Sequence, residues 1–342
     1  MPRIPHRLLR HARRADSLLP ALLLACRDIA SARNELRWLR EHAEREAPAS
    51  WRPLLRDMVR HRSAGRPLQY ILGTEYFGDL EIACRPGVLI PRQETAASVA
   101  YLTERLSPAL PKPLRVLDLC TGTGCIPLLF EDLLARTTPA PDVQLLGIDV
   151  SPRCVDLARH NARRCGSRRT DFALADVLSG GVASQSSVPP LMALLREKNM
   201  LNWDLLISNP PYISSHAFTH TTTRSVRNYE PKLALVPPTS TNKAMDSGDL
   251  FYPRLLEIAD QVQAMVILFE VADMDQALRV ARMAESTQSW HSIEIWKDEP
   301  AAKDLNSRHM VDDAHGFRAL GCGNGRSVVC WRHEASQWSE AR

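Results

Sequence analysis

From residue 114 onward, strand-like and helix-like segments alternate, and this alternation limits the fold more than any other feature of the sequence. The expected strands are short apolar runs at 114–119, 143–149, 172–175, 203–208, 264–271, 292–296 and 327–331. Amphipathic segments between them predict helices at 125–135, 152–165, 250–261 and 273–285. Continuous apolar strands separated by helices are typical of a parallel sheet with helices on both faces. We therefore expect a doubly wound α/β domain.

Two further parts precede this domain. Apolar residues recur at helical spacing up to residue 64, which predicts a small helical domain over residues 1–64. Short apolar runs separated by glycine and proline predict a β-hairpin linker over 65–92. The α/β domain then covers 93–342. Within it, residues 179–202 break the alternation and predict a surface insertion, and residues 297–325 are expected to be irregular.

The charge of the chain is unevenly distributed. Residues 1–66 hold fifteen arginines, no lysine and seven acidic residues, a net charge of +8 in a chain whose total is +4. A basic helical domain is either an ordinary solvated surface or a docking surface for an acidic partner or nucleic acid, and the sequence leaves both open. The first fifteen residues contain five arginines and no acid, which is typical of a mitochondrial targeting segment (1–15) and equally of a first helix.

Composition excludes several classes of protein. With 44% hydrophobic and 24% charged residues, the chain is neither mostly disordered nor fibrous. No apolar run approaches the ~18–20 residues of a membrane span, so we expect no membrane span, and no secretory segment is recognisable. The eight cysteines are scattered without a Cys-x-x-Cys pair or a Cys/His cluster. We therefore expect free, mostly buried thiols and no metal site.

The first candidate site is the run Asp118-Leu-Cys-Thr-Gly-Thr-Gly124, where a buried strand ends in an acid and a glycine-containing turn opens a helix. Ligands of doubly wound sheets bind at the carboxyl ends of the strands, and glycines there let the backbone approach a ligand. The third glycine of a dinucleotide fingerprint and the lysine of a phosphate loop are both missing. Asp118 would repel a pyrophosphate but suit a cationic aminoacyl group, which favours S-adenosylmethionine as the cofactor.

Two more acids end neighbouring strands. Asp149 could accept hydrogen bonds from both hydroxyls of a ribose. Asp176 could accept a hydrogen bond from the amino group of adenine, although a solvated loop aspartate explains it equally well. We therefore place both acids with the candidate cofactor site.

The strand at 203–208 ends in Asn209-Pro210-Pro211-Tyr212. An amide or aromatic amine is a poor nucleophile because its lone pair is held in resonance. If the Asn209 side-chain oxygen and the Pro210 carbonyl each accept one N–H, the lone pair turns towards a methyl donor. The prolines stiffen the turn, and Tyr212 offers a flat face for stacking. The motif therefore predicts methylation of a planar nitrogen.

Together these motifs resemble the HemK/PrmC family of S-adenosylmethionine-dependent protein-(glutamine-N5) methyltransferases. That family methylates the glutamine of the Gly-Gly-Gln motif in class I peptide chain release factors, in translation termination. The resemblance also rests on residues 66–73 with Phe77, 89–95, 229–235 and 248–252. It implies a Rossmann-like methyltransferase sheet with a small N-terminal helical domain that docks the substrate.

The resemblance also implies a role for each motif. S-adenosylmethionine would be bound by Asp118, Cys120, Thr121, Gly122, Thr123, Gly124, Asp149, Asp176, Val177 and Asn209. Catalysis would depend on Asn209, Pro210 and Tyr212, and the substrate would contact Asn209, Pro210, Pro211, Tyr212, Phe77 and Arg92. The partner would be a class I release factor, with no obligate nucleic acid and no metal. We expect a monomer in the mitochondrion or, failing that, the cytoplasm.

Three departures and two alternatives accompany this interpretation. Cys120 stands where the family has glycine, Gln93 replaces a proline, and the insertion is long for the family. One alternative is a nucleic-acid amino-methyltransferase acting on adenine N6 or ribosomal RNA guanine N2, which shares the Asn-Pro-Pro-Tyr motif. The slightly acidic main body weighs against it. The other alternative is a non-catalytic binding module that keeps a cofactor fold, and the intact motif weighs against that.

Overall fold

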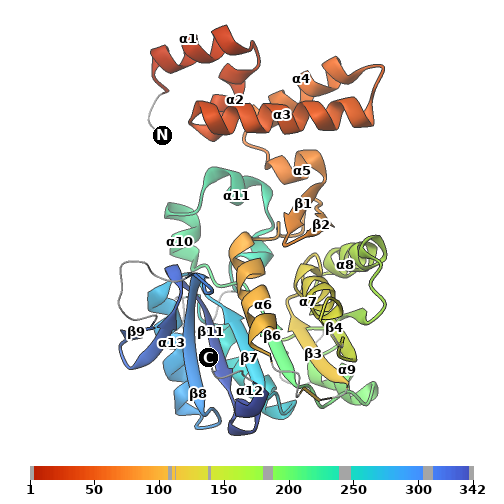
Figure 1. Ribbon diagram of the computed structural model, residues 1–342, viewed down its shortest axis with the longest axis vertical. Helices are drawn as coiled ribbons and strands as arrows, with labels where there is room; N and C mark the ends of the chain where they lie inside the picture. Colours follow the sequence, from red (N-terminus) through yellow and green to blue (C-terminus); the bar gives the residue numbers. More distant parts are fainter. Residues whose placement is uncertain are drawn as a thin grey trace. The chain divides into compact units, whose positions relative to one another are not determined.

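The computed structural model describes residues 4–106, 110–111, 113–137, 140–179, 188–238, 248–302 and 311–338. The chain divides into two compact units (Figure 1). The first unit comprises Met1–Thr74, Cys84–Gly87 and Thr222–Glu230. The second comprises Glu75–Ala83, Val88–Thr221 and Pro231–Arg342.

The first unit is helical. Its helices are α1 (His6–Ala15), α2 (Leu19–Cys26), α3 (Ile29–Glu46), α4 (Trp51–Ser63), α5 (Leu68–Leu72) and α11 (Arg224–Tyr229). Leu22, Leu23 and Leu39 are fully buried in its core, because the leucines of α2 and α3 recur at helical spacing and face inward. The half-buried Arg62–Glu35 ion pair, with Nε–Oε2 2.7 Å apart, joins α4 to α3.

Helix α11 belongs to this unit although it lies far along the chain. The Ser225 hydroxyl donates to the carbonyl of Gly65 (2.7 Å), and the Tyr229 hydroxyl donates to the carbonyl of Ala64 (3.3 Å). Because these bonds satisfy carbonyls just after α4, residues 222–230 complete the helical unit rather than the second one.

The second unit is built on a nine-stranded sheet with the order β5-β4-β3-β6-β7-β11-β8-β10-β9. Its strands are β3 (Leu114–Leu119), β4 (Val143–Asp149), β5 (Thr170–Leu174), β6 (Leu205–Ser208), β7 (Val266–Glu270), β8 (Ser292–Glu299), β9 (Val311–Ala314), β10 (Phe317–Leu320) and β11 (Cys322–Trp331). Strands β5, β4, β3, β6 and β7 are parallel neighbours. Their carboxyl ends therefore meet at one edge of the sheet.

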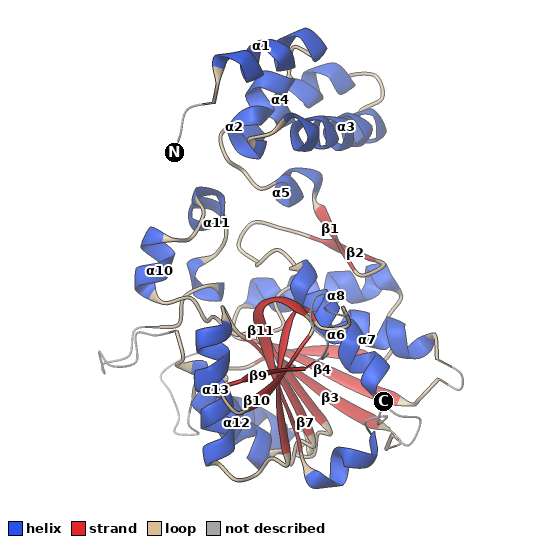
Figure 2. Cartoon of the chain, turned by 60° about the vertical axis from the view of Figure 1, so that its left-hand side comes forward, coloured by secondary structure: helices blue, strands red, loops and turns tan. Residues whose placement is uncertain are grey.

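Helices cover both faces of this sheet (Figure 2). One face packs against α6 (Gln93–Arg105), α7 (Cys125–Ala135) and α8 (Pro152–Cys165). The other packs against α9 (Leu191–Glu197), α12 (Phe251–Gln261) and α13 (Met274–Ser286). The short helix α10 (Ser215–His220) follows the Asn-Pro-Pro-Tyr motif. The predicted Rossmann-like α/β class is confirmed.

Two expectations about the end of the chain were wrong. Strand β11 runs antiparallel between β7 and β8, so the sheet is mixed rather than wholly parallel. The segment 297–325, expected to be irregular, contains β9, β10 and part of β11. Strands β9 and β10 are joined by a tight turn at His315 and Gly316, whose φ values of 52° and 94° suit a two-residue hairpin. Glycines and register shifts in the first part of β11 explain why the sequence pattern there did not predict a strand.

Other expectations concern single segments. Of the expected insertion, residues 180–187 lie outside the described residues, and α9 follows them.

All eight cysteines are free thiols, and four are buried. No described helix is long and apolar enough to span a membrane. Over the same described ranges, no group of three or more His, Cys, Asp or Glu side chains could hold a metal ion.

A small two-stranded sheet is hydrogen-bonded to the second unit through the buried side chain of Asn161. Strands β1 (Thr74–Phe77) and β2 (Leu80–Ala83) form this small sheet. The Asn161 amide on α8 accepts from the Ala83 N–H (2.9 Å) and donates to the carbonyls of Ala83 (3.2 Å) and Thr123 (2.9 Å). Asn161 therefore joins β2 to the turn that follows β3.

Replacing Asn161 by alanine should lower the free energy of unfolding by about 3 kcal/mol, because buried backbone groups of Ala83 and Thr123 lose their partner. Arg164→Ala is the control, since Arg164 lies on the same helix and pairs with Glu81 at the exposed surface. It should cost less than about 1 kcal/mol. Urea denaturation of both variants measures the difference, and equal losses would contradict the role of Asn161.

Candidate functional site

The parallel strands deliver polar side chains to one edge of the sheet. In the register, Leu119 of β3 pairs with Ser208 of β6, which pairs with Phe269 of β7. Asp118 precedes Leu119, whereas Asn209 follows Ser208 and Glu270 follows Phe269. Asp149 ends β4 beside them. Since clefts in such sheets open at the carboxyl ends, this edge is the candidate site.

The turn after β3 is held in a conformation that favours glycine. Cys120, Gly122 and Gly124 have φ values of 64°, 57° and 79°. A Cβ on Gly124 would lie 2.7 Å from the Phe172 ring, whereas a Cβ on Gly122 would meet no atom within 4 Å. Gly124 therefore serves internal packing. Gly122 leaves open space above the turn.

Cys120 occupies a left-handed position, in which glycine, the residue expected from the family resemblance, would be unstrained. For an L-residue this conformation costs roughly 1–2 kcal/mol. The turn keeps its geometry because the neighbouring Thr121 N–H donates to the carbonyl of Ile148 (2.9 Å). Cysteine at position 120 therefore adopts the left-handed backbone conformation at a cost in strain.

Asp149 ties β4 to this turn. Its Oδ2 accepts from the Gly122 N–H and its Oδ1 accepts from the Ser151 N–H, both at 2.9 Å. Each oxygen has a further lone pair, so the carboxylate can accept hydroxyl donors as well. Burial raises the pKa of Asp149, while the backbone donors favour its charged form.

Asp118 is completely buried, and neither of its carboxylate oxygens has a hydrogen-bond partner among the described residues. Burial raises the pKa of Asp118 to about 8, against the opposing effect of the nearby Thr121 hydroxyl, and the charge of Asp149 adds to the rise. The Thr121 hydroxyl oxygen beside it is also buried without a partner in the described part of the chain. An unpaired buried carboxylate is costly, so this pair of residues is suited to a polar or cationic ligand.

Asp176 and Val177 follow β5 in the same edge region. Asp176 Oδ1 accepts from the Leu178 N–H (2.9 Å), which shapes the loop. Val177 is buried against the α9 side of the core, and its carbonyl accepts from Arg254 Nε (3.2 Å). Both positions are therefore well ordered by local contacts.

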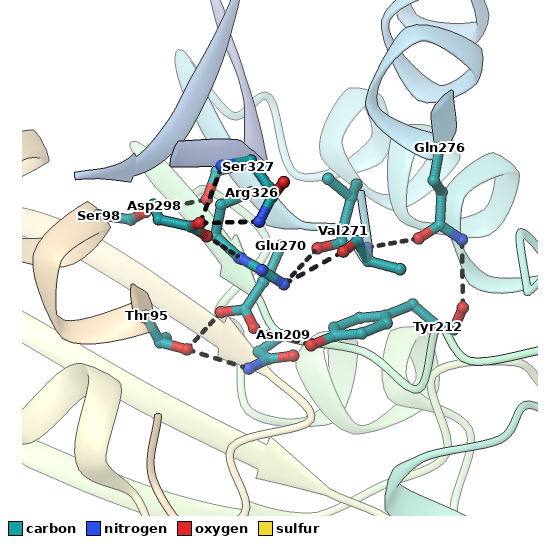
Figure 3. Close-up of polar contacts among 12 residues, drawn as sticks. Thr95, Ser98, Asn209, Tyr212, Glu270, Val271, Gln276, Asp298, Arg326 and Ser327 are labelled. Atoms are coloured by element: carbon teal, nitrogen blue, oxygen red, sulfur yellow. Dashed lines mark hydrogen bonds and ion pairs between the residues drawn. The ribbon is translucent and has the colours of Figure 1, made fainter. Parts of the chain in front are cut away.

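The Asn-Pro-Pro-Tyr motif is held by a buried acid (Figure 3). Asn209 Nδ2 donates to the Thr95 hydroxyl (3.3 Å), which in turn donates to Glu270 Oε2. The Tyr212 hydroxyl donates to Glu270 Oε1 (3.1 Å). Pro210 between them is buried. Glu270 thus anchors both ends of the motif.

The main chain of Tyr212 is clamped from α13. Gln276 Nε2 donates to the carbonyl of Tyr212 (3.3 Å) and to Asp249 Oδ1 (2.8 Å). Asp249 is paired with Arg279, Oδ2–Nε 2.6 Å. A Cβ on Gly248 would lie 2.0 Å from the Tyr212 carbonyl oxygen, so only glycine fits there. Burial and the charge of Glu270 raise the pKa of Tyr212, which keeps its hydroxyl protonated.

The structure does not bring every expected substrate residue to this cluster. Phe77 is fully buried in the core beneath α6 and α7. Its ring therefore serves packing and lies away from the surface of the site. Arg92 directly precedes α6 and is half-buried. Its positive charge, together with that of Arg326, partly offsets the rise in the pKa of Tyr212 that burial and Glu270 cause.

Four site residues were not among those expected from the sequence: Thr95, Glu270, Asp249 and Gln276. Glu270 carried a signal, because it ends an apolar strand in the same way as Asp118 and Asp149. Thr95 and Asp249 lie in stretches that support the family resemblance, but neither stretch indicates a partner for its side chain. Gln276 gives no signal in the sequence.

No family model matches the chain. Among curated proteins, it is 35% identical over 240 residues to the Saccharomyces cerevisiae mitochondrial MRF1 N(5)-glutamine methyltransferase MTQ1, covering 69% of this chain and 68% of that protein. It is 33% identical to the MRF1 mitochondrial N(5)-glutamine methyltransferase mtq1 named in Schizosaccharomyces pombe, covering 86% and 94%. The release factor glutamine methyltransferase of Chlorobaculum tepidum is 36% identical, covering 60% and 65%.

Among solved structures, the human methyltransferase 10 domain containing protein matches with a TM-score of 0.47 and 16% identity, covering 79% of this chain and 95% of that one. This similarity is too distant to bear on function. The curated relatives therefore carry the comparison.

The strain at Cys120 is testable by two substitutions. Cys120→Gly should be more stable than Cys120→Ala by about 1 kcal/mol, because both remove the thiol and only glycine relieves the left-handed backbone. At Cys154, inside helix α8, the order should reverse by about the same amount. Chemical denaturation measures all four variants. Alanine matching or exceeding glycine at position 120 would contradict the assigned strain.

The buried carboxyl of Asp118 should make stability depend on pH. Its pKa is about 8 in the folded protein against an ordinary value of 3.8, so between these values the native state holds a proton that the unfolded chain has lost. Stability should therefore fall as pH rises, by up to about 1.4 kcal/mol per unit.

Asp118→Asn should make this fall shallower, because only the Asp118 contribution is lost and the buried acids Asp149 and Glu270 still contribute, and the exposed Asp171→Asn should leave it unchanged. Urea denaturation at pH values between about 5 and 8 compares the variants with the original chain. Parallel curves for all three proteins would disprove the raised pKa of Asp118.

Proposed function

The chain belongs to the HemK/PrmC family of release factor glutamine methyltransferases, and we propose that it methylates the side-chain amide nitrogen of the glutamine in the Gly-Gly-Gln motif of a class I peptide chain release factor. The observation that carries this proposal is the orientation of Asn209. Its Nδ2 donates to the Thr95 hydroxyl, and its Oδ1 has no hydrogen-bond partner among the described residues. An acceptor is therefore free to bind an N–H of the substrate.

We assign the methyl donor, S-adenosylmethionine, to the edge formed by Asp118, Gly122 and Asp149. The residues fit this group. Asp118 offers a buried carboxylate for the ammonium, the open space above Gly122 admits a ligand close to the backbone, and Asp149 retains lone pairs for hydroxyls. When bound, S-adenosylmethionine supplies an electrophilic methyl group on a sulfonium.

The protein's own contribution to the transfer is positioning. Asn209 Oδ1 and the carbonyl of Pro210 would each accept one N–H of the glutamine amide, which orients the nitrogen so that its lone pair faces the methyl donor. Pro210 and Pro211 hold the turn rigid. The neutral ring of Tyr212 would stack on the flat amide. Because the proton can leave after transfer, the reaction requires no strong base.

The partner is a protein in this proposal, and its compartment is the mitochondrion. The two fungal relatives are named for mitochondrial MRF1, and neither relative's name favours nucleic acid. Residues 1–66 carry a net charge of +8, which suits docking of an acidic surface. Raising the salt concentration should therefore weaken binding of the release factor, and a tagged full-length chain should be found in mitochondria.

The function is tested by incubating the full-length chain with labelled S-adenosylmethionine and purified release factor. Label should enter the release factor but not a variant whose Gly-Gly-Gln glutamine is replaced, and not RNA. Asn209→Ala should lower kcat by about 100-fold or more while cofactor affinity changes little, because the lost bond acts on the amide during transfer. Near-normal turnover of Asn209→Ala would sink the proposed role, and label in the glutamine-free variant would sink the substrate.

A further inference from the structure

Glu270 is a buried acid for which the proposed reaction gives no task. It ends β7, and its side chain is 2% exposed. Its Oε2 accepts from Thr95 and its Oε1 from Tyr212, while the Tyr252 hydroxyl donates to its carbonyl oxygen (2.9 Å). A buried carboxylate is costly, so its retention between two members of one motif calls for an explanation.

The direction of the hydrogen bonds supplies one (Figure 3). An ionised carboxylate has no proton and can only accept, so the Thr95 hydroxyl must give its single proton to Glu270. The Thr95 oxygen is then only an acceptor towards Asn209, which must turn its NH₂ group to Thr95. The Asn209 oxygen consequently faces away from Thr95, where a substrate amide needs an acceptor.

A protonated Glu270 would not impose this direction. Its carboxyl O–H could donate a hydrogen bond to Thr95 Oγ1, and the Thr95 hydroxyl could then donate its own proton in a hydrogen bond to Asn209 Oδ1. The Asn209 carboxamide would then turn over and present its NH₂ group to the substrate, and this group cannot accept the N–H of the substrate amide. The protonation state of Glu270, two hydrogen bonds away from Asn209, thus decides whether the oxygen or the NH₂ group of the Asn209 carboxamide faces the substrate.

We propose that Glu270 is a positioning residue for methyl transfer: its carboxylate acts through Thr95 to hold the Asn209 oxygen towards the substrate amide, and directly on Tyr212 to fix the ring. This inference rests on the proposed function. It also gives the threonine of the 89–95 stretch a role, because Thr95 is the only side chain that joins Glu270 to Asn209 among the described residues.

The charges around Glu270 come from several elements. The Arg326 guanidinium of β11 favours the ionised carboxylate, and Glu94 of α6 opposes it. Arg326 is itself held by Asp298, Nε–Oδ1 2.8 Å, and donates to the carbonyls of Val271 and Ala272. Burial is the largest influence and raises the pKa of Glu270 above its ordinary value. Lowering the pH should therefore protonate Glu270 and reduce kcat.

The test compares substitutions that keep shape and change only proton direction. Glu270→Gln cannot accept from both Thr95 and Tyr212, because one end of its amide is a donor. We expect kcat to fall by about tenfold or more, with the Kd for S-adenosylmethionine within about twofold, and the acid limb of the pH profile to disappear. Thr95→Val should lose as much, since valine has the shape of threonine without the hydroxyl.

Three further variants separate positioning from simple packing. Thr95→Ser keeps the hydroxyl and should keep kcat. Thr95→Val combined with Glu270→Gln should lose no more than the worse single variant, because both act through the same chain of bonds. Ser98→Ala is the matched control. It removes a buried bond to Ser327 (3.0 Å) from the same helix without touching Asn209 or Tyr212, and should leave kcat unchanged.

The outcomes distinguish the two claims. If the unaltered chain does not methylate the release factor, the proposed function fails and this inference fails with it. If that chain is active and Glu270→Gln or Thr95→Val keeps its kcat, the inference alone is wrong. Equal losses in Thr95→Ser and Thr95→Val, or multiplied losses in the double variant, also overturn it. Should Glu270→Gln not fold, the comparison of serine with valine at position 95 decides.

Discussion

Parallel pairing of β3 with β6 and of β6 with β7 is the constraint from which the site follows. The register places Leu119, Ser208 and Phe269 side by side, so Asn209 directly follows β6, Glu270 ends β7 and Asp118 lies one residue before the end of β3. Because parallel strands end together, polar residues far apart in the chain meet without any long loop. The apolar cores on both faces keep this edge in register, since a slip of one residue would exchange the side chains that pack in one core with those that pack in the other.

Two acids at this edge oppose the stability of the fold. Asp118 has no partner among the described residues, and Glu270 is buried among hydroxyl donors. Neither arrangement suits a chain selected for stability alone, because burial disfavours both charged forms. A ligand ammonium would relieve the first acid, and the second is used to orient a neutral amide. The burial of two acids at this edge is thus consistent with the chemistry proposed for it.

The sequence predicted the family, the α/β class and most strands, because the apolar runs and Asn209-Pro-Pro-Tyr212 are local signals. The antiparallel insertion of β11 could not be predicted, since pairing partners are not encoded in periodicity. The contact between Thr95 and Glu270 joins residues 175 positions apart and depends on how α6 packs on the sheet. Phe77 shows the opposite problem, because a residue in a family stretch can serve the core alone.

The assignment of α11 to the helical unit has an evolutionary consequence. The chain leaves and re-enters that unit twice, at residues 84–87 and 222–230, after its first segment ends at Thr74. A gene fusion that joined a foreign helical module at a single boundary would lack the bonds that Ser225 and Tyr229 make to Gly65 and Ala64. The helical unit and the α/β unit are therefore interleaved along the chain, and they are expected to be inherited together rather than exchanged as independent domains.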